Sequence, residues 1–391
     1  MCSSDLYFPL KGKGAVYGAK YGWERANWFA PQGVAPADDH TFEIPNWFEH
    51  VAAEHKNARE NVVLIDQSSF CKFEVQGPGA LAFLNRLCAN QIDKPVGKVI
   101  YSQMCNERGT IECDLTIGRL AEDRFFLVVG TAFGLRAAWW LNNHLPADGS
   151  VSVKEMTSAY AVINVIGPKS RELLQKLTNA DIGHEGFAFG TCKNFTIGYA
   201  PVMSFRVTYV GELGYELYIP TEFAVHVYES LWEAGRDLGI TNAGYRTISS
   251  MHLEKGYADW GSELTPEYTP FDAGLGFCVA LDKDDFLGKE ALAKVKAAGP
   301  AWKLCSFTIE SETPLMLQGS APVIYKGKVL GVTTSSGYGH TVKKNICYGY
   351  ISVEDASHDG GYEIEVYKEV YPAKLESSRA LYDPERKKIL I

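Results

Sequence analysis

The sequence predicts an α+β protein with more than one domain, and three observations support this. The chain has 391 residues, which is too many for one small core and enough for two or three domains. A strand–turn–helix pattern occurs twice, at 73–87 and 161–177, each time through a Gly-Pro turn. After a Gly-Pro break at residue 299, short strands alternate with turns, which predicts a small β-barrel or sandwich.

The composition of the chain argues against several classes of binding partner. Hydrophobic content is 46% and charged content 22%, as in ordinary globular proteins, and the net charge of −9 does not indicate a nucleic-acid partner. The nine cysteines include no Cys-x-x-Cys pair, so we expect free thiols in a reducing compartment and no metal site. No apolar run approaches membrane-spanning length, and no secretory signal is recognisable. We therefore expect a cytoplasmic protein (mitochondrial matrix if eukaryotic) with no membrane partner.

The start of the chain is rich in aromatic residues and turn formers. Indoles as dense as those of 21–29 and 45–48 indicate packing against another domain or a core edge. We expect three regions: an aromatic arm or linker over 1–45, two α+β units over 46–298, and the β domain over 299–391. The first six residues, Met1 to Leu6, resemble the translation of a sequencing adapter, which predicts a gene truncated at its 5′ end; an ordinary polar tail is the alternative.

Hydrophobic periodicity and turn residues predict the elements in order. We expect helices at 47–60, 80–87, 132–145, 170–177, 223–235 and 289–296, and one that ends at Gly256. We expect strands at 62–65, 70–75, 111–117, 125–129, 159–166, 304–309, 321–325, 328–333, 346–351 and 362–366. In the helix at 132–145, both Trp139 and Trp140 are expected in the core.

The most informative stretch runs from Arg206 to Pro220. Strand-like residues at 207–210 and 215–219 flank a glycine-containing loop at 211–214, which predicts a β-hairpin. Tyr209 offers a flat aromatic face, and Glu216 places a carboxylate among apolar strand residues, where it is costly unless it is paired or hydrogen-bonded. Glu216 lies either on a solvated strand face or in a site for a ligand with two parallel N–H groups.

This stretch resembles the hairpin of the glycine-cleavage T-protein, an aminomethyltransferase that uses tetrahydrofolate. In that family a tyrosine and a glutamate seven residues apart line the folate pocket, and the resemblance assigns these roles to Tyr209 and Glu216. The glutamate would accept the N–H and amino groups of the pterin. The resemblance spans about residues 10 to 385 and implies a three-domain ring with folate in a central channel and a C-terminal β-barrel.

A second matching stretch is the turn and strand that end in Asp114-Leu115. The resemblance assigns the catalytic aspartate to Asp114, with a positioning and general-base role toward the folate nitrogen. Glu112 shares its strand face and has no matching role. Tyr101 and Trp260 are further candidates for the folate pocket.

The segment 244–264 is more similar to sarcosine and dimethylglycine dehydrogenases than to the T-protein, as is the aromatic arm, which resembles their linker between flavin and folate halves. Here the chain departs from the T-protein, since Ile248 and His252 stand where that family has arginines. Any folate contact made by those arginines is lost or made differently here. We interpret His252 as a hydrogen-bonded helix histidine. A basic turn at 343–345 either reaches the pocket or is solvated.

The resemblance implies tetrahydrofolate-dependent one-carbon transfer. The carbon released by oxidative N-demethylation of a sarcosine- or dimethylglycine-type amine, as in glycine betaine catabolism, would be trapped as 5,10-methylenetetrahydrofolate. The partners would be folate, a small N-methyl amine or its iminium product, and a flavin oxidase domain or subunit. The chain shows no Gly-x-Gly-x-x-Gly flavin fingerprint, so we expect FAD only through a missing or separate domain.

Three alternatives stay open. The first is a free-standing folate-dependent aminomethyltransferase or demethylase. The second is a folate module of the iron–sulfur assembly type, which is disfavoured because Lys255-Gly256 is followed by Tyr257 rather than cysteine. The third is a non-catalytic scaffold or folate-binding module.

Overall fold

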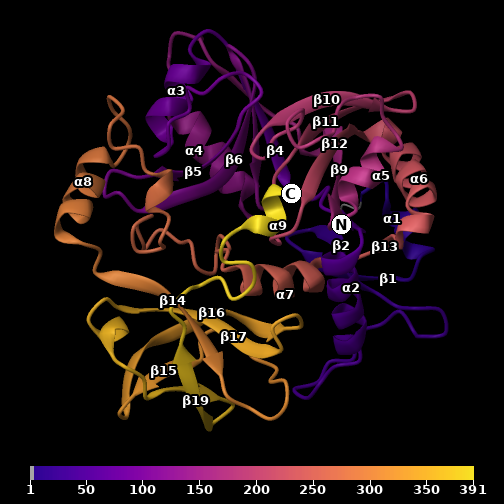
Figure 1. Ribbon diagram of the computed structural model, residues 1–391. Helices are drawn as coiled ribbons and strands as arrows, with labels where there is room; N and C mark the ends of the chain where they lie inside the picture. The colour runs from indigo at the N-terminus through magenta and orange to yellow at the C-terminus, as the bar shows by residue number, and fades with distance from the viewer. Residues whose placement is uncertain (1–3) are drawn as a thin grey trace.

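The computed structural model describes residues 4–391, and its elements form three lobes around the middle of the molecule (Figure 1). Residues 1–3 of the adapter-like segment lie outside the described residues. The predicted fold class is confirmed, since helices and sheets are mixed and the chain has the T-protein fold with a closed barrel at its C-terminal end.

The first lobe is a five-stranded sheet in the order β5-β6-β7-β4-β8, with two helices. Its strands are β4 (Cys71–Gln76), β5 (Val99–Cys105), β6 (Ile111–Ala121), β7 (Arg124–Val129) and β8 (Ser152–Glu155), and its helices are α3 (Ala80–Leu87) and α4 (Gly134–Asn143). A short 3-10 helix, η1 (Thr131–Phe133), leads into α4. Apolar side chains of α3, α4 and the sheet form one core cluster.

The second lobe is a six-stranded sheet in the order β10-β11-β12-β9-β3-β13. Its strands are β3 (Val63–Asp66), β9 (Tyr160–Ile166), β10 (Cys192–Ile197), β11 (Ala200–Phe205), β12 (Gly214–Pro220) and β13 (Thr241–Asn242), and the helices packed on it are α1 (Tyr7–Lys11), α5 (Ser170–Gln175) and α6 (Ala224–Ala234). The two predicted strand–turn–helix units are β4–α3 and β9–α5. In each turn a glycine, Gly77 or Gly167, has a positive φ and lies so close to a neighbouring carbonyl that a Cβ would clash.

The third lobe is the closed barrel β14-β17-β16-β15-β18-β19, which confirms the predicted C-terminal barrel. Its strands are β14 (Trp302–Ile309), β15 (Pro322–Tyr325), β16 (Lys328–Gly339), β17 (Lys344–Ser352), β18 (Tyr362–Val366) and β19 (Glu369–Leu375). Helix α8 (Lys289–Ala298) precedes the barrel, and α9 (Lys387–Leu390) follows it. Strand β19 was not predicted.

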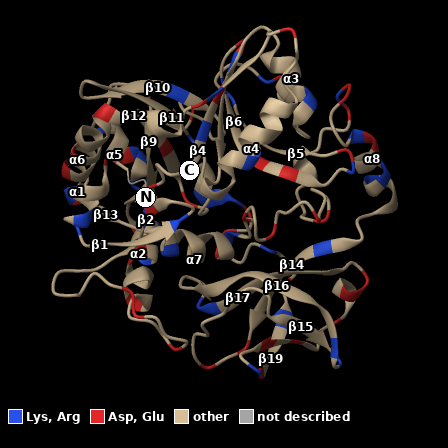
Figure 2. Cartoon of the chain, turned by 180° about the vertical axis from the view of Figure 1, so that it is seen from behind, with Lys and Arg blue, Asp and Glu red and all other residues tan. Residues whose placement is uncertain are grey.

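Helix α7 (Tyr245–Lys255) lies between the lobes, next to α2 (Phe48–Glu60) and the hairpin of β1 (Ala15–Lys20) and β2 (Trp23–Phe29) (Figure 1). It ends at Gly256, as predicted, because that residue adopts the left-handed conformation that favours glycine. Acidic and basic residues are scattered over all three lobes rather than segregated on one (Figure 2). Among residues 4–391, no helix combines the length and apolarity that crossing a membrane requires.

Two details of the prediction were wrong. Strand β11 ends at Phe205, so 207–210 is a loop rather than the first strand of the hairpin; the carbonyl of Val210 accepts a hydrogen bond from Arg59 instead of from a neighbouring strand. Trp139 is 61% exposed whereas Trp140 is 7% exposed. Because α4 buries one face only, two adjacent residues cannot both enter the core.

Candidate functional site

Asp114 occupies the middle of β6, where its carboxylate accepts a hydrogen bond of 2.9 Å from the Gln103 amide on the paired strand β5. The side chain is half-buried. Burial raises its pKa from 3.8 to about 6; Gln103 and Tyr101 oppose this effect, and the charge of Asp259 adds to it. A carboxylate with a pKa near neutrality is suited to accept a proton in catalysis.

Two tyrosines, Tyr101 and Tyr209, come from different lobes and are affected by the charge of this carboxylate. Burial, followed by the charge of Asp114, raises the pKa of Tyr101 well above its ordinary value. Tyr209 donates a hydrogen bond of 3.1 Å to the carbonyl of Ala258, and its ring stacks on His252 at 5.3 Å. Burial raises its pKa too, and the charges of Asp259 and Asp114 contribute. The structure therefore places Tyr101 beside Asp114, with Tyr209 within range of the charge of Asp114.

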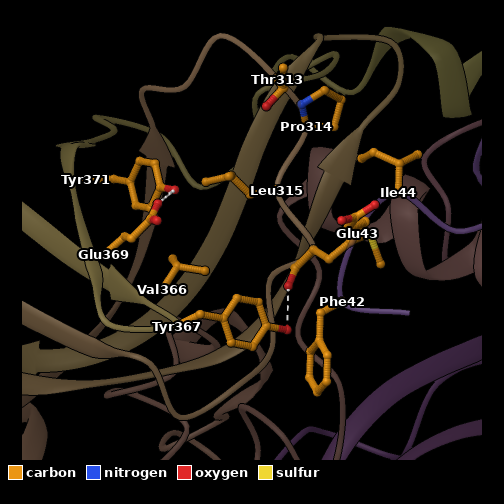
Figure 3. A pocket seen from close by; sticks show the side chains of 11 residues that line it. Phe42, Glu43, Ile44, Thr313, Pro314, Leu315, Val366, Tyr367, Glu369 and Tyr371 are labelled. Atoms are coloured by element: carbon orange, nitrogen blue, oxygen red, sulfur yellow. Dashed lines mark hydrogen bonds between the residues drawn. The ribbon is translucent and has the colours of Figure 1, made fainter. Parts of the chain in front are cut away.

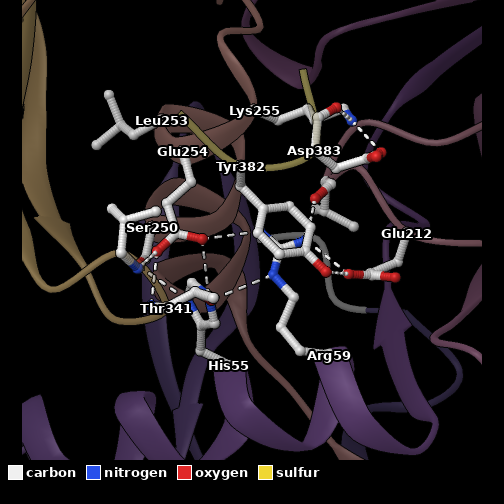
Figure 4. Close-up of polar contacts among 12 residues, drawn as sticks. His55, Arg59, Glu212, Ser250, Leu253, Glu254, Lys255, Thr341, Tyr382 and Asp383 are labelled. Carbon is white, nitrogen blue, oxygen red and sulfur yellow. Dashed lines mark hydrogen bonds and ion pairs between the residues drawn. The ribbon is translucent and has the colours of Figure 1, made fainter. Parts of the chain in front are cut away.

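A buried polar network holds the loop that carries Tyr209 (Figure 4). Arg59 of α2 donates to the Val210 carbonyl at 2.9 Å, to Glu212 at 3.0 Å and to Glu254 of α7 at 3.0 Å. The hydroxyl of Tyr382, far along the chain, donates to Glu212 at 2.6 Å. Because these groups come from α2, α7 and the C-terminal segment, the position of Tyr209 depends on all three.

Trp260 lies in a short loop that follows α7. Its indole ring meets Phe133 edge-on at 5.6 Å, and its Nε1–H is buried without a partner among residues 4–391. Glu263 fixes the loop by accepting the backbone N–H of Asp259 and that of Ser335 on β16, each at 2.8 Å. An unpaired buried N–H is costly, so Trp260 has an unused donor for a ligand.

Glu216 lies on β12 between Asn164 of β9 and Phe205 of β11. Burial raises its pKa, although the Tyr218 hydroxyl donates to one carboxylate oxygen at 2.5 Å. The Phe205 ring stands against Gly118, four residues after Asp114 on β6. At about 3.3 Å per strand residue, Gly118 is roughly 13 Å along β6 from Asp114. Glu216 is therefore placed beyond the cluster of Asp114, Tyr101 and Tyr209.

Other predicted residues have structural partners. His252 Nδ1 lies 3.1 Å from the Tyr257 carbonyl, consistent with a hydrogen-bonded helix histidine. Glu112 forms an ion pair with Arg136 of α4. Lys343 and Lys344 are exposed, which favours the solvated alternative for that turn. A hollow of about 330 Å³ between residues 42–44 and the barrel is lined by Leu315, Tyr367 and their neighbours (Figure 3); none of the predicted site residues lines it.

Sequence reasoning missed Asp259 as a site residue. Its carboxylate forms no ion pair with the residues that the structure describes, and its charge acts on both Asp114 and Tyr209. Burial raises its pKa and the charge of Glu263 adds to this effect, whereas His252 opposes it. The only sequence feature that could have indicated Asp259 is its place directly before Trp260, in the loop after the helix that ends at Gly256.

These features define a protein of the folate-binding T-protein class: two α+β lobes and a barrel, with a half-buried aspartate beside tyrosines from two lobes. Residues 6–283 match the family model for the GCVT N-terminal domain, and residues 303–383 match that for the glycine cleavage T-protein C-terminal barrel domain. The chain belongs to the glycine cleavage T-protein family.

Curated relatives include both dehydrogenases and aminomethyltransferases. The chain is 39% identical over 99% of its length to 4-methylaminobutanoate oxidase (formaldehyde-forming) of Paenarthrobacter nicotinovorans, and 34% identical over 99% to dimethylglycine dehydrogenase of Rattus norvegicus. It covers only 46% and 45% of those two proteins, so it spans less than half of their length. It is also 32% identical over 83% of its length to the aminomethyltransferase of Halothermothrix orenii and covers 90% of that protein.

A solved structure confirms the fold. Aminomethyltransferase T of the glycine cleavage system from Bartonella henselae superposes with a TM-score of 0.82 over 97% of this chain and 98% of that one, at 24% identity.

Proposed function

We propose that this chain catalyses tetrahydrofolate-dependent one-carbon transfer, trapping the carbon released by oxidative N-demethylation of a sarcosine- or dimethylglycine-type amine as 5,10-methylenetetrahydrofolate. The observation that supports this most is the environment of Asp114. Its pKa is raised to about 6, and its carboxylate is hydrogen-bonded by Gln103. The flavin that oxidises the amine would belong to a domain or subunit outside this chain, and residues 1–45 would be the linker toward it.

The residues of the site fit a folate. Among residues 4–391, one oxygen of Glu216 has no hydrogen-bond partner, and the Trp260 Nε1–H has no acceptor. A half-buried carboxylate, which can only accept, suits the adjacent N–H donors of a pterin. The aromatic rings of Tyr209 and Trp260 offer flat surfaces for a bound heterocycle.

Tetrahydrofolate, when bound, supplies the nucleophilic nitrogens that take up the one-carbon unit. Asp114 accepts the proton lost from the attacking nitrogen on a carboxylate oxygen, while the Gln103 amide holds the carboxylate in place. Tyr209, held by its bond to the Ala258 carbonyl, orients the ligand. Glu216 binds the pterin edge at a distance from the proton transfer. Together, these residues would hold the attacking nitrogen and the one-carbon unit in a geometry from which they can react.

The test is calorimetric titration of tetrahydrofolate into the intact chain, Glu216→Gln and Asp114→Asn. We expect saturable binding that Glu216→Gln weakens by about 1.5–3 kcal/mol, the usual worth of a charge-assisted hydrogen bond. Asp114→Asn is expected to keep most of the binding and lose formation of methylenetetrahydrofolate from added formaldehyde. Absence of binding in the folded, intact chain would refute the proposal.

Two other functions have support from particular relatives. A free-standing aminomethyltransferase is favoured by the Halothermothrix relative, most of whose length the chain covers. A non-catalytic role is favoured by the mouse mitochondrial pyruvate dehydrogenase phosphatase regulatory subunit, which is 36% identical over 92% of this chain. If the wild-type chain binds tetrahydrofolate but forms no methylenetetrahydrofolate, the non-catalytic role is favoured.

A further inference from the structure

Arg25 is a charged side chain that has no ion-pair partner among residues 4–391. It lies on β2, and its guanidinium carbon is 3.6 Å from the ring centroid of Tyr245. Its Nε–H is buried without an acceptor, and Arg25 forms no ion pair with any of residues 4–391. A guanidinium stacked on an aromatic ring keeps its N–H edge in the plane, where it can bind a carboxylate through two hydrogen bonds.

Contacts from Tyr245 link Arg25 to the proposed site. The Tyr245 hydroxyl is 3.3 Å from Ser69 Oγ, which is 2.9 Å from Thr131 Oγ1. Thr131 begins η1, and the last residue of η1, Phe133, packs on Trp260. This chain of contacts connects Arg25, through four intervening residues, to Trp260, and the charge of Arg25 acts on the neighbouring Asp259.

Two cations near Asp259 come from the β1–β2 hairpin, Lys20 and Arg25. Lys20 pairs with Trp23 and Gly18 with Arg25, so Lys20 and Arg25 share one face of the hairpin. On the face of α7 that begins at Tyr245, positions 248 and 252 are isoleucine and histidine. Burial raises the pKa of Asp259, whereas the charge of His252 and, after it, those of Lys20 and Arg25 lower it.

A folate ligand needs such a cation. Folates end in a glutamyl group with two carboxylates, and the proposed site already holds Asp114 and Asp259, which repel anions. We propose that Arg25, assisted by Lys20, binds a carboxylate of the folate glutamyl tail. This inference rests on the proposed function and adds to it that the arm hairpin contributes to ligand recognition.

The experiment compares two ligands and two charge states of the protein. Tetrahydrofolate and its bis-amide, in which both glutamyl carboxylates are neutral amides of the same size, are titrated into the wild-type chain and Arg25→Gln. We expect the wild-type chain to bind tetrahydrofolate roughly 10- to 100-fold more tightly than the bis-amide, as for a charge-assisted hydrogen bond. In Arg25→Gln this preference is expected to disappear, while affinity for the bis-amide stays unchanged.

Matched variants separate this role from a structural one. Arg236→Gln removes the same charge from an exposed position that pairs with Glu233 and is expected to retain the preference. Arg25→Lys is expected to retain part of it. Equal affinity of the wild-type chain for both ligands, or an equal loss for both in Arg25→Gln, would overturn the inference. Because the wild-type comparison needs no variant, the test survives if Arg25→Gln fails to fold. Binding of neither ligand would instead refute the proposed function.

Discussion

Asp114→Asn should stabilise the protein while abolishing its activity. An aspartate whose pKa is raised from 3.8 to about 6 in the folded state destabilises that state at neutral pH. At 1.36 kcal/mol per pKa unit, the cost is about 3 kcal/mol. Asparagine has nearly the same shape, can still accept the Gln103 hydrogen bond, and carries no charge to desolvate.

The effect of Asp114 on the stability of the folded state depends on pH. Well below pH 4, Asp114 is protonated in the folded and the unfolded states, so its burial costs nothing. As the pH rises to about 6, the unfolded state loses this proton while the folded state retains it, and the stability falls. The advantage of asparagine should therefore appear between pH 4 and 6 and stay constant above.

Thermal unfolding measures this effect. With an unfolding entropy of about 2.1 cal/mol/K per residue, ~3 kcal/mol corresponds to a rise of about 4 °C in Tm if the 391 residues unfold together. We expect this rise at pH 7.5 and a much smaller one at pH 4, because the unfolded-state pKa of 3.8 leaves the carboxyl only partly ionised there. A Tm equal to or below that of the wild-type chain at pH 7.5 would show that Asp114 is not held in an unfavourable environment, and the general-base argument would lose its basis.

Three further predictions concern the same site. The rate of methylenetetrahydrofolate formation should fall on the acid side with an apparent pKa near 6, as Asp114 becomes protonated; a rate that is constant from pH 5 to 8 would contradict this. Arg59→Ala should lower the free energy of unfolding by about 3–5 kcal/mol, because Glu212 and Glu254 lose a buried partner, whereas Tyr382→Phe should cost about 1 kcal/mol in the same denaturation assay. Gly118→Val should cost roughly 1–3 kcal/mol, since even a Cβ would lie 2.3 Å from the Phe205 ring, and an unchanged Tm would refute that packing.

Local signals predicted most of the elements because their patterns are strong. Helix α3 begins and ends at the predicted residues, since a Gly-Pro-Gly turn precedes it and its apolar face is regular. The segment 207–210 was predicted as a strand because its residues are strand-like, but it is a loop. Its conformation is set by Arg59, more than 140 residues away, and no local pattern reports such a partner.

The candidate site was predictable only in part. Asp114, Tyr209 and Glu216 were assigned from a resemblance, and the structure adds their surroundings: Tyr101 and Gln103 beside Asp114, Tyr218 beside Glu216. Asp259 and Arg25 could not be assigned, because an acid in a loop and a cation on a hairpin are ordinary surface features in a sequence. Their importance depends on which side chains lack a partner, and this is visible only in three dimensions.

The bond between Tyr382 and Glu212 has a consequence for biosynthesis. It joins residues 170 positions apart, and with Arg59 it fixes the loop that carries Tyr209. At a synthesis rate of about 5–20 residues per second, the ribosome needs roughly 10–30 s to add the later partner after the earlier one. The two α+β lobes can form during this interval, but the ligand site is completed last, when the C-terminal segment returns from the barrel to the centre of the molecule.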